Sequence, residues 1–386
     1  MNQSNLAQIF QHYIDRFEYI NSDAHGEYYK WQVCHSFPKW MNRALAAKDD
    51  DAFVKALTEA KKCTENIIDS YTQPFGGLVE IAKKDPEKHS AQAVRQLFQD
   101  LYADDGGDLK VQAEKIAAFF RRSNELLDEY FPGSFLYKQN SHSVSSYLFL
   151  YDPDHHYMYK AVQSQRFADC VEFYDDWGSG DNIKLDVYYR MCDELVAAIK
   201  ECPELLETDK SRFDGRLKLN GGKLHSDAEK HILAFDIIYC CSVYDLFDGI
   251  AYTKRNLKEK QLYLEKKTKA DQLKQSFEKA KADAELLDEA LTTFIEMVSI
   301  GDKISHSNYG EGTVTSVDRK YLVADYGAGT KKISLPVGIA NGWIKLDNPN
   351  FEGKVSIYRE ILLRHEKIPG ALDNAAKLLE PYEEYL

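Results

Sequence analysis

Residues 301–314 read GDKISHSNYGEGTV, and they open a segment whose pattern differs from everything before it. Short runs of alternating polar and apolar residues follow one another between glycines, as in small antiparallel sheets. Gly310 and Gly312 permit the positive backbone φ angles of a tight turn between two strands. We predict five strands, over 303–306, 313–317, 322–326, 331–335 and 343–346. Strands this short and closely spaced suit a small closed β-barrel at 300–346.

This stretch resembles the Tudor/SH3-like barrel at the C-terminus of UvrD/PcrA-type helicases, whose pattern is G-D-x-V-x-H-x-x-F-G-x-G-x-V. Ile304 takes the place of the first valine and Tyr309 that of the phenylalanine. The resemblance implies a docking module for proteins or nucleic acid, without catalysis of its own. A purely packing role for His306 and Tyr309 fits the sequence equally well. The partner-binding residues implied are His306, Tyr309, Tyr326, Lys331 and Lys332.

The segment before the barrel, 251–299, contains no proline or glycine until Gly301 and is predicted to be a long, coiled-coil-like helix. Its second half carries apolar residues at alternating steps of four and three, the spacing of a coiled-coil seam or a bundle helix. The seam at 273–298 offers a surface for homo-oligomerisation. Its positions are Leu273, Phe277, Ala280, Ala284, Leu287, Leu291, Phe294 and Val298.

Basic residues concentrate in one part of this acidic chain, whose formal net charge is −13. Between positions 254 and 281, ten Lys and Arg residues face four acidic ones, a balance of +6. A helix with such a stripe could follow a DNA or RNA backbone, whereas the acidic total argues against coating nucleic acid over the whole surface. A solvated helix face is the alternative. The candidate nucleic-acid-binding residues are Lys254, Arg255, Lys258, Lys260, Lys266, Lys267 and Lys269.

The rest of the chain is predicted to be mainly helical, so that the whole is a multi-domain α+β protein with a helical body. Residues 1–133 form a helical domain, 134–250 a mixed but mostly helical recognition domain, and 347–386 C-terminal helices. In the second of these, 143–151 (SVSSYLFLY) suits a strand, although a buried helix fits so short a run too. Helices are expected over 27–45, 53–71, 92–102 and 109–130, the second ended by Pro74, Gly76 and Gly77.

Five short stretches follow one another within residues 95–250: 98–102 (FQDLY), 131–133 (FPG), 143–148 (SVSSYL), 151–154 (YDPD) and 157–160 (YMYK). In this order they resemble a segment that precedes the motor in McrB-like AAA+ restriction proteins. The resemblance implies a recognition region coupled to a nucleotide-driven motor. The motor itself is not expected here, because the sequence has no GxxxxGK[ST] phosphate-binding loop.

The remaining chemistry-bearing residues predict neither a metal site nor a cofactor. The seven cysteines are scattered without a CxxC pair, which indicates free thiols in a reducing cytoplasm. No secretory signal or membrane span is evident, so a soluble cytoplasmic protein is expected. Three clusters contain residue types that occur in metal or nuclease sites, but ordinary turn, cap and surface roles are expected for them: Asp152, Asp154, His155 and His156; His225, Asp227 and His231; Glu204, Glu207, Asp209 and Lys210.

Three hypotheses for function follow. The first is a non-catalytic accessory or recognition protein of a bacterial genome-defence (antiviral, restriction-like) or DNA-transaction system, which binds DNA, RNA or a partner such as a motor ATPase or nuclease. The second is a protein–protein adaptor whose barrel docks on the transcription machinery, with RNA polymerase as the partner. The third is an enzyme, a divergent metal-dependent nuclease.

Overall fold

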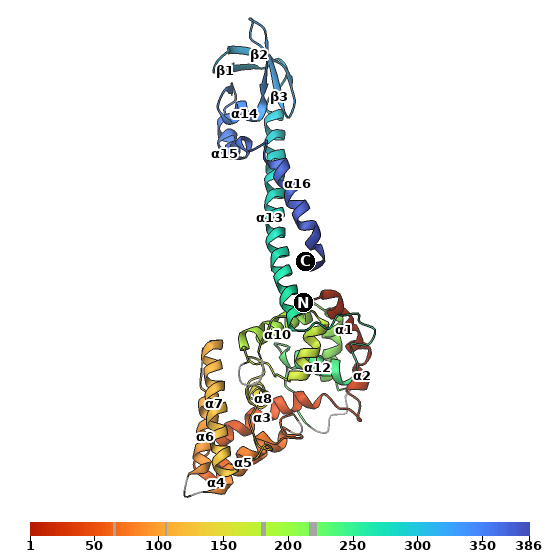
Figure 1. Cartoon of the computed structure of the whole chain (residues 1–386), viewed down its shortest axis with the longest axis vertical. Helices are drawn as coiled ribbons and strands as arrows, with labels where there is room; N and C mark the ends of the chain where they lie inside the picture. The colour runs from red at the N-terminus through yellow and green to blue at the C-terminus, as the bar shows by residue number, and fades with distance from the viewer. Residues whose placement is uncertain (65–66, 86, 88, 105, 179–182, 216–221) are drawn as a thin grey trace. The chain divides into compact units, whose positions relative to one another are not determined.

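The computed structural model describes residues 1–64, 67–85, 87, 89–104, 106–178, 183–215 and 222–386. The chain divides into two compact units, Met1–Asn256 and Leu257–Leu386 (Figure 1). The regular secondary structure among the described residues of the first is all helical, and the second combines helices with a five-stranded antiparallel sheet. The predicted α+β class is therefore confirmed. The finer division into five domains stays a prediction.

The first unit is built from thirteen described helices. They are α1 (Gln3–Asp15), α2 (Phe17–Ile20), α3 (Tyr29–Leu45), α4 (Asp50–Cys63), α5 (Pro74–Lys84), α6 (Ser90–Leu101), α7 (Leu109–Tyr130), α8 (Ser141–Tyr151), α9 (Ala161–Cys170), α10 (Leu185–Lys200), α11 (Pro203–Lys210), η2 (Ser211–Phe213) and α12 (His231–Val243). One hydrophobic core extends through them, with members from Leu6 to Ile250.

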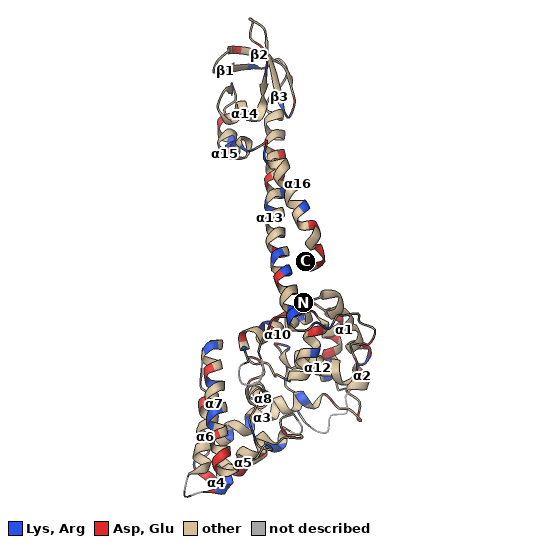
Figure 2. Cartoon of the chain, viewed as in Figure 1, with Lys and Arg blue, Asp and Glu red and all other residues tan. Residues whose placement is uncertain are grey.

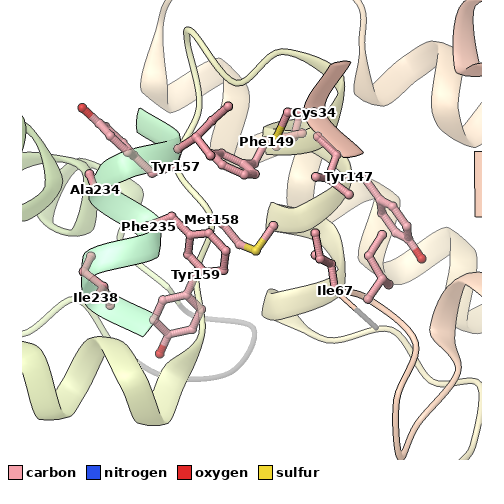
Figure 3. Close-up of a cluster of buried hydrophobic side chains, with 14 of the residues drawn as sticks. Cys34, Ile67, Tyr147, Phe149, Tyr157, Met158, Tyr159, Ala234, Phe235 and Ile238 are labelled. Carbon is pink, nitrogen blue, oxygen red and sulfur yellow. The ribbon is translucent and has the colours of Figure 1, made fainter. Parts of the chain in front are cut away.

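Helices α8 and α12 lie inside this core. Figure 3 shows Tyr147 and Phe149 of α8 in one cluster with Phe235 of α12 and with Met158, which lies between α8 and α9. The prediction of a strand at 143–151 is therefore wrong, and the alternative of a buried helix is confirmed. A helix buried on all sides has no polar face, so its apolar residues show no helical period. Its serines can be buried because they bond locally: the Ser146 hydroxyl, for example, donates to the carbonyl of His142 at 2.7 Å.

The prediction that Pro74, Gly76 and Gly77 end a helix is also wrong, because these residues begin α5. Proline is tolerated in the first turn of a helix, where its missing N–H would have no partner. The Asp69 carboxylate accepts the backbone N–H groups of Phe75 and Gly76, at 2.9 Å each. Gly77 lies against a neighbouring segment, since a Cβ there would come within 2.5 Å of the Tyr137 Cβ.

The second unit begins with a single 40-residue helix, α13 (Leu257–Glu296), within the segment 251–299 for which the sequence predicted a long helix. The sheet and three helices follow: β1 (Lys303–His306), β2 (Gly310–Val317), β3 (Tyr321–Asp325), β4 (Thr330–Ser334), α14 (Leu335–Ala340), β5 (Ile344–Leu346), α15 (Phe351–Leu363) and α16 (Ile368–Leu379), with η3 (Glu380–Tyr385) at the end. Each of the five strands overlaps a predicted one, and β2 begins at Gly310 where the prediction began at 313. The short helix α14 was not foreseen.

The strands are arranged in the order β4-β3-β2-β1-β5. Ile304 of β1 lies opposite Gly312 of β2 and Leu346 of β5, and Leu322 of β3 lies opposite Val317 and Ile333. β4 and β5 are the two edge strands. The sheet is therefore open, whereas the sequence predicted a closed barrel.

A candidate docking site on the C-terminal sheet

Three of the residues that the sequence singled out form an aromatic cluster at one end of the sheet. The rings of His306 and Tyr309 stack with their centroids 4.5 Å apart, and the Tyr326 ring lies 5.4 Å from Tyr309 and 6.2 Å from His306. His306 ends β1, Tyr309 lies in the turn before β2, and Tyr326 directly follows β3. Gly310, with a φ of 76°, makes the tight turn possible.

Gly312 makes room for this cluster. A Cβ at this position would lie 2.6 Å from Cε1 and 2.7 Å from Cδ1 of Tyr326, closer than any side chain can approach. The Tyr326 hydroxyl is buried and has no hydrogen-bond partner within the described part of the chain. Burial raises the pKa of Tyr326, so that its hydroxyl keeps its proton. It can therefore donate to a group brought by a ligand.

His306 is only 5% exposed, and its protonation is set by its surroundings. The backbone N–H of Asn308 donates to Nδ1 at 3.1 Å, so Nδ1 carries no proton. Burial lowers the pKa of His306, which keeps the imidazole neutral. The remaining ring proton is then on Nε2, and His306 is a hydrogen-bond donor at that atom.

Lys331 adds a positive charge to the cluster, since its Nζ lies 5.5 Å from the centroid of the Tyr309 ring. Its neighbour Lys332 does not join it. Successive residues of a strand point to opposite faces of the sheet, and Lys332 lies over the ring of Tyr321, with its Nζ 3.8 Å from the centroid. The structure thus brings together four of the five predicted partner-binding residues: His306, Tyr309, Tyr326 and Lys331, hereafter the Tyr309 cluster.

The Tyr309 cluster combines an exposed aromatic ring with three donors. Tyr309 is 46% exposed, whereas His306 beneath it is buried. His306, Tyr326 and Lys331 offer an imidazole N–H, a phenol O–H and an ammonium group. The segment 301–346 carries six basic and four acidic residues, a balance of +2 in a chain of net charge −13. An aromatic anchor beside donors and positive charge suits a ligand that presents acceptors, above all carboxylates.

The predicted basic stripe is less uniform than its sequence suggests. Arg255 is paired with Glu172 at 3.2 Å and also contacts Tyr174, so its charge is partly compensated. Lys266 donates to the Tyr385 hydroxyl at 2.8 Å. Lys254 and Arg255 belong to the first unit, whereas Lys258, Lys260, Lys266, Lys267 and Lys269 lie on α13. Figure 2 shows acidic residues interspersed with basic ones along this helix. Nucleic-acid binding stays a prediction.

The apolar seam of α13 is used within its own unit. Phe294 is fully buried and contacts the rings of Phe351 and Tyr358 on α15, at centroid distances of 5.5 and 6.3 Å. Figure 1 shows α16 running alongside α13, and Tyr385 of η3 packs on Tyr263 at 5.5 Å. The prediction of self-association through 273–298 stays open, on a surface that α15 and α16 already cover in part.

In each of the three acidic and histidine clusters, carboxylates have partners within the protein. Asp152 pairs with His155 at 2.9 Å, and Asp227 accepts the N–H groups of Ile232 and Leu233 at the start of α12. Asp209 is buried and forms ion pairs with Arg212 and Lys230, at 3.0 Å each. Among the described residues, no three His, Cys, Asp or Glu side chains gather as a metal site would require.

Sequence reasoning missed a buried ionic network in the first unit. Asp236 of α12 accepts from Lys30, from the Tyr13 hydroxyl at 2.5 Å and from Arg212 at 3.4 Å. All four side chains are essentially inaccessible to solvent. Burial alone would raise the pKa of Asp236, but the charges of Lys30 and Arg212 lower it. These residues lie far apart in the sequence, and only an isolated acid in the apolar run of α12 hinted at them.

Comparisons of the chain with protein-family models, with curated proteins and with solved structures gave no significant match. The two family resemblances noted in the sequence accordingly remain expectations. No helix in the part of the chain that the structure describes is both long and apolar enough to cross a membrane.

Proposed function

We propose that this protein is a non-catalytic recognition protein of a bacterial genome-defence or DNA-transaction system, and that its C-terminal sheet docks on an acidic segment of a partner protein. In this proposal the open sheet belongs to the SH3-like, Tudor-like class of small barrels. The partner would be a motor ATPase, a nuclease or, in the adaptor version, RNA polymerase. The placement in defence or DNA transactions rests on the two sequence resemblances.

The single observation that carries the docking proposal is the Tyr309 cluster. Tyrosine beside a cation is a frequent anchor of protein interfaces, because its ring buries a large area at little cost in conformational entropy. The unpartnered Tyr326 hydroxyl supports the proposal further, because a buried donor without an acceptor costs free energy that a bound carboxylate would recover.

The chain offers a matched control for testing this proposal. Tyr321 with Lys332 is a second tyrosine–lysine pair on the opposite face of the same sheet, and Tyr321 is 38% exposed. Binding of an acidic peptide to the full chain would be measured by calorimetry for wild type, for Tyr309→Ala with Lys331→Gln, and for Tyr321→Ala with Lys332→Gln. A peptide with Asn and Gln in place of Asp and Glu serves as the ligand control.

We expect the first double variant to weaken binding roughly tenfold or more, since interface anchors contribute more than about 1.4 kcal/mol. The second double variant should leave binding unchanged, and the uncharged peptide should bind poorly. Equal losses in both variants, or equal affinity for both peptides, would refute docking through the Tyr309 cluster.

Nucleic-acid binding is the second candidate, favoured by exposed lysines on α13 such as Lys258 and Lys269. It would be tested with duplex and single-stranded oligonucleotides across a salt series, because phosphate contacts lose affinity steeply as salt rises. Replacing Lys258 and Lys269 by Gln should reduce the salt slope. The absence of any binding at low salt would remove nucleic acid from the proposal.

A further inference from the structure

The first unit contains a cavity of about 490 Å³ that the docking function does not use. It lies where the end of α6, the start of α7 and the end of α8 meet, together with the turn that follows α8. Its volume is within the range of small-molecule sites, roughly 300–1,000 Å³. The lining residues that matter here are Tyr102, Asp104, Gln112, Tyr151, Asp152 and His156.

Two tyrosines present their rings, not their hydroxyls, to this cavity. The rings of Tyr102 and Tyr151 stack with centroids 3.8 Å apart and planes within 10° of parallel. The Tyr102 hydroxyl donates to the carbonyl of Tyr147 at 3.2 Å, and the Tyr151 hydroxyl donates to Oδ1 of Asn42 at 2.7 Å. Because both hydroxyls are engaged within the protein, the wall that they form is an aromatic surface.

Gln112, in the first turn of α7, has an unsatisfied acceptor. Its side chain lines the cavity and is only 4% exposed. Nε2 lies 2.7 Å from Nδ1 of His156, whereas Oε1 is buried and has no hydrogen-bond partner among the described residues. An unmet acceptor of this kind costs about 1–3 kcal/mol. A ligand with an N–H donor would satisfy it.

The charged groups of the cavity favour a cation. Asp104 and Asp152 both line it, and each carries a carboxylate. Asp104 accepts the backbone N–H of Gly106 at 2.9 Å. Asp152 pairs at 2.9 Å with His155, which also lines the cavity and whose pKa this hydrogen bond raises. Each carboxylate has further acceptor positions. Lys115 contacts the carbonyl of Ala103 on the rim. Besides His155 and His156, the polar and aromatic side chains of the lining are these two carboxylates, Gln112 and the two tyrosines.

We propose that this cavity binds a small organic cation with N–H donors, of the class of linear alkyl diamines. One ammonium group would lie against the aromatic wall and Asp152, since cations are attracted to tyrosine faces. The ammonium hydrogens would donate to the carboxylates of Asp152 and Asp104 and to Oε1 of Gln112. The inference stands apart from the docking proposal, because it uses no residue of the C-terminal unit.

The test is calorimetric titration of the full chain with 1,4-diaminobutane. The neutral 1,4-butanediol and the dianion butanedioate, which have the same carbon chain, serve as ligand controls. We expect 1,4-diaminobutane to bind and the two control ligands not to bind. Failure of the diamine to bind, or equal binding of the diol, would overturn the proposal.

Variants locate the site. Asp152→Asn and Tyr151→Leu should each weaken the diamine about tenfold, whereas Tyr151→Phe, which keeps the ring, should bind as wild type does. Asp128→Asn, at an exposed position of α7, is the matched control and should change nothing. If Tyr151→Leu unfolds, the exposed Asp104→Asn takes its place with the same expectation. Wild-type affinity in both aspartate variants would overturn the assignment.

Discussion

Replacing Asp236 by asparagine should destabilise the first unit strongly, because it removes one charge from a buried network without changing its shape. Breaking a buried ion pair typically costs about 3–5 kcal/mol. Lys30 would keep Glu27 at 2.8 Å and Arg212 would keep Asp209 at 3.0 Å, so neither cation is left alone. We therefore expect the free energy of unfolding to fall by about 3 kcal/mol, the lower end of that range. This is a large share of a typical free energy of unfolding, about 5–15 kcal/mol.

Urea unfolding of the full chain, followed by tryptophan fluorescence, measures this loss. Trp31 is a suitable reporter, since the Arg212 guanidinium lies 3.9 Å from the centroid of its ring. The control is Asp175→Asn, which breaks an exposed pair with Arg190 and should cost no more than about 1 kcal/mol. If Asp236→Asn and its control were equally stable, the network would not hold the first unit together.

Three further predictions concern packing and protonation. Gly312→Ala should cost the C-terminal unit about 1–3 kcal/mol by forcing Tyr326 aside, whereas Gly353→Ala, with open space around it, should gain about 0.5–1 kcal/mol; urea unfolding compares the two. Phe294→Ala should lower the free energy of unfolding by about 3–5 kcal/mol, because it removes a buried ring. Leu286→Ala, on the exposed side of α13, should lower it by less than about 1 kcal/mol. Equal losses in the two variants would contradict packing through the seam. Burial and the nearby charge of Lys30 lower the pKa of Lys160 to about 8; because both disfavour the ammonium form, Lys160 should lose its proton before other lysines as the pH rises. NMR titration of methyl-labelled lysines would test this, and an ordinary value near 10.4 would refute it.

The sequence predicted the C-terminal strands well, because each is short, alternating and bounded by glycines. It also placed α7 at 109–130, the bounds that the structure has. It failed at 143–151 and at Pro74, where the decisive interactions come from elsewhere in the chain. Asp69 supplies the hydrogen bonds that begin α5, and the core around α8 removes the polar face on which helical periodicity depends.

The candidate sites also differ in how far the sequence could predict them. The Tyr309 cluster was predictable because its residues belong to one motif, although the separation of Lys332 depended on strand register. The cavity where α6, α7 and α8 meet and the Asp236 network were not predictable, since the residues of each come from three or more helices. Gln112 illustrates this, because nothing in its neighbouring sequence distinguishes it. Only the structure shows that its Nε2 lies beside His156 and that its buried Oε1 has no hydrogen-bond partner among the described residues.

The most direct measurement of the docking claim is photo-crosslinking of an acidic peptide to a photoreactive residue placed at position 309 or, for comparison, at position 321. The two positions have similar exposure but lie in different surroundings, one beside His306 and Tyr326 and the other beneath Lys332. We predict an efficient crosslink from position 309 and little from position 321. Equal yields from both positions, or a higher yield from position 321, would contradict the account.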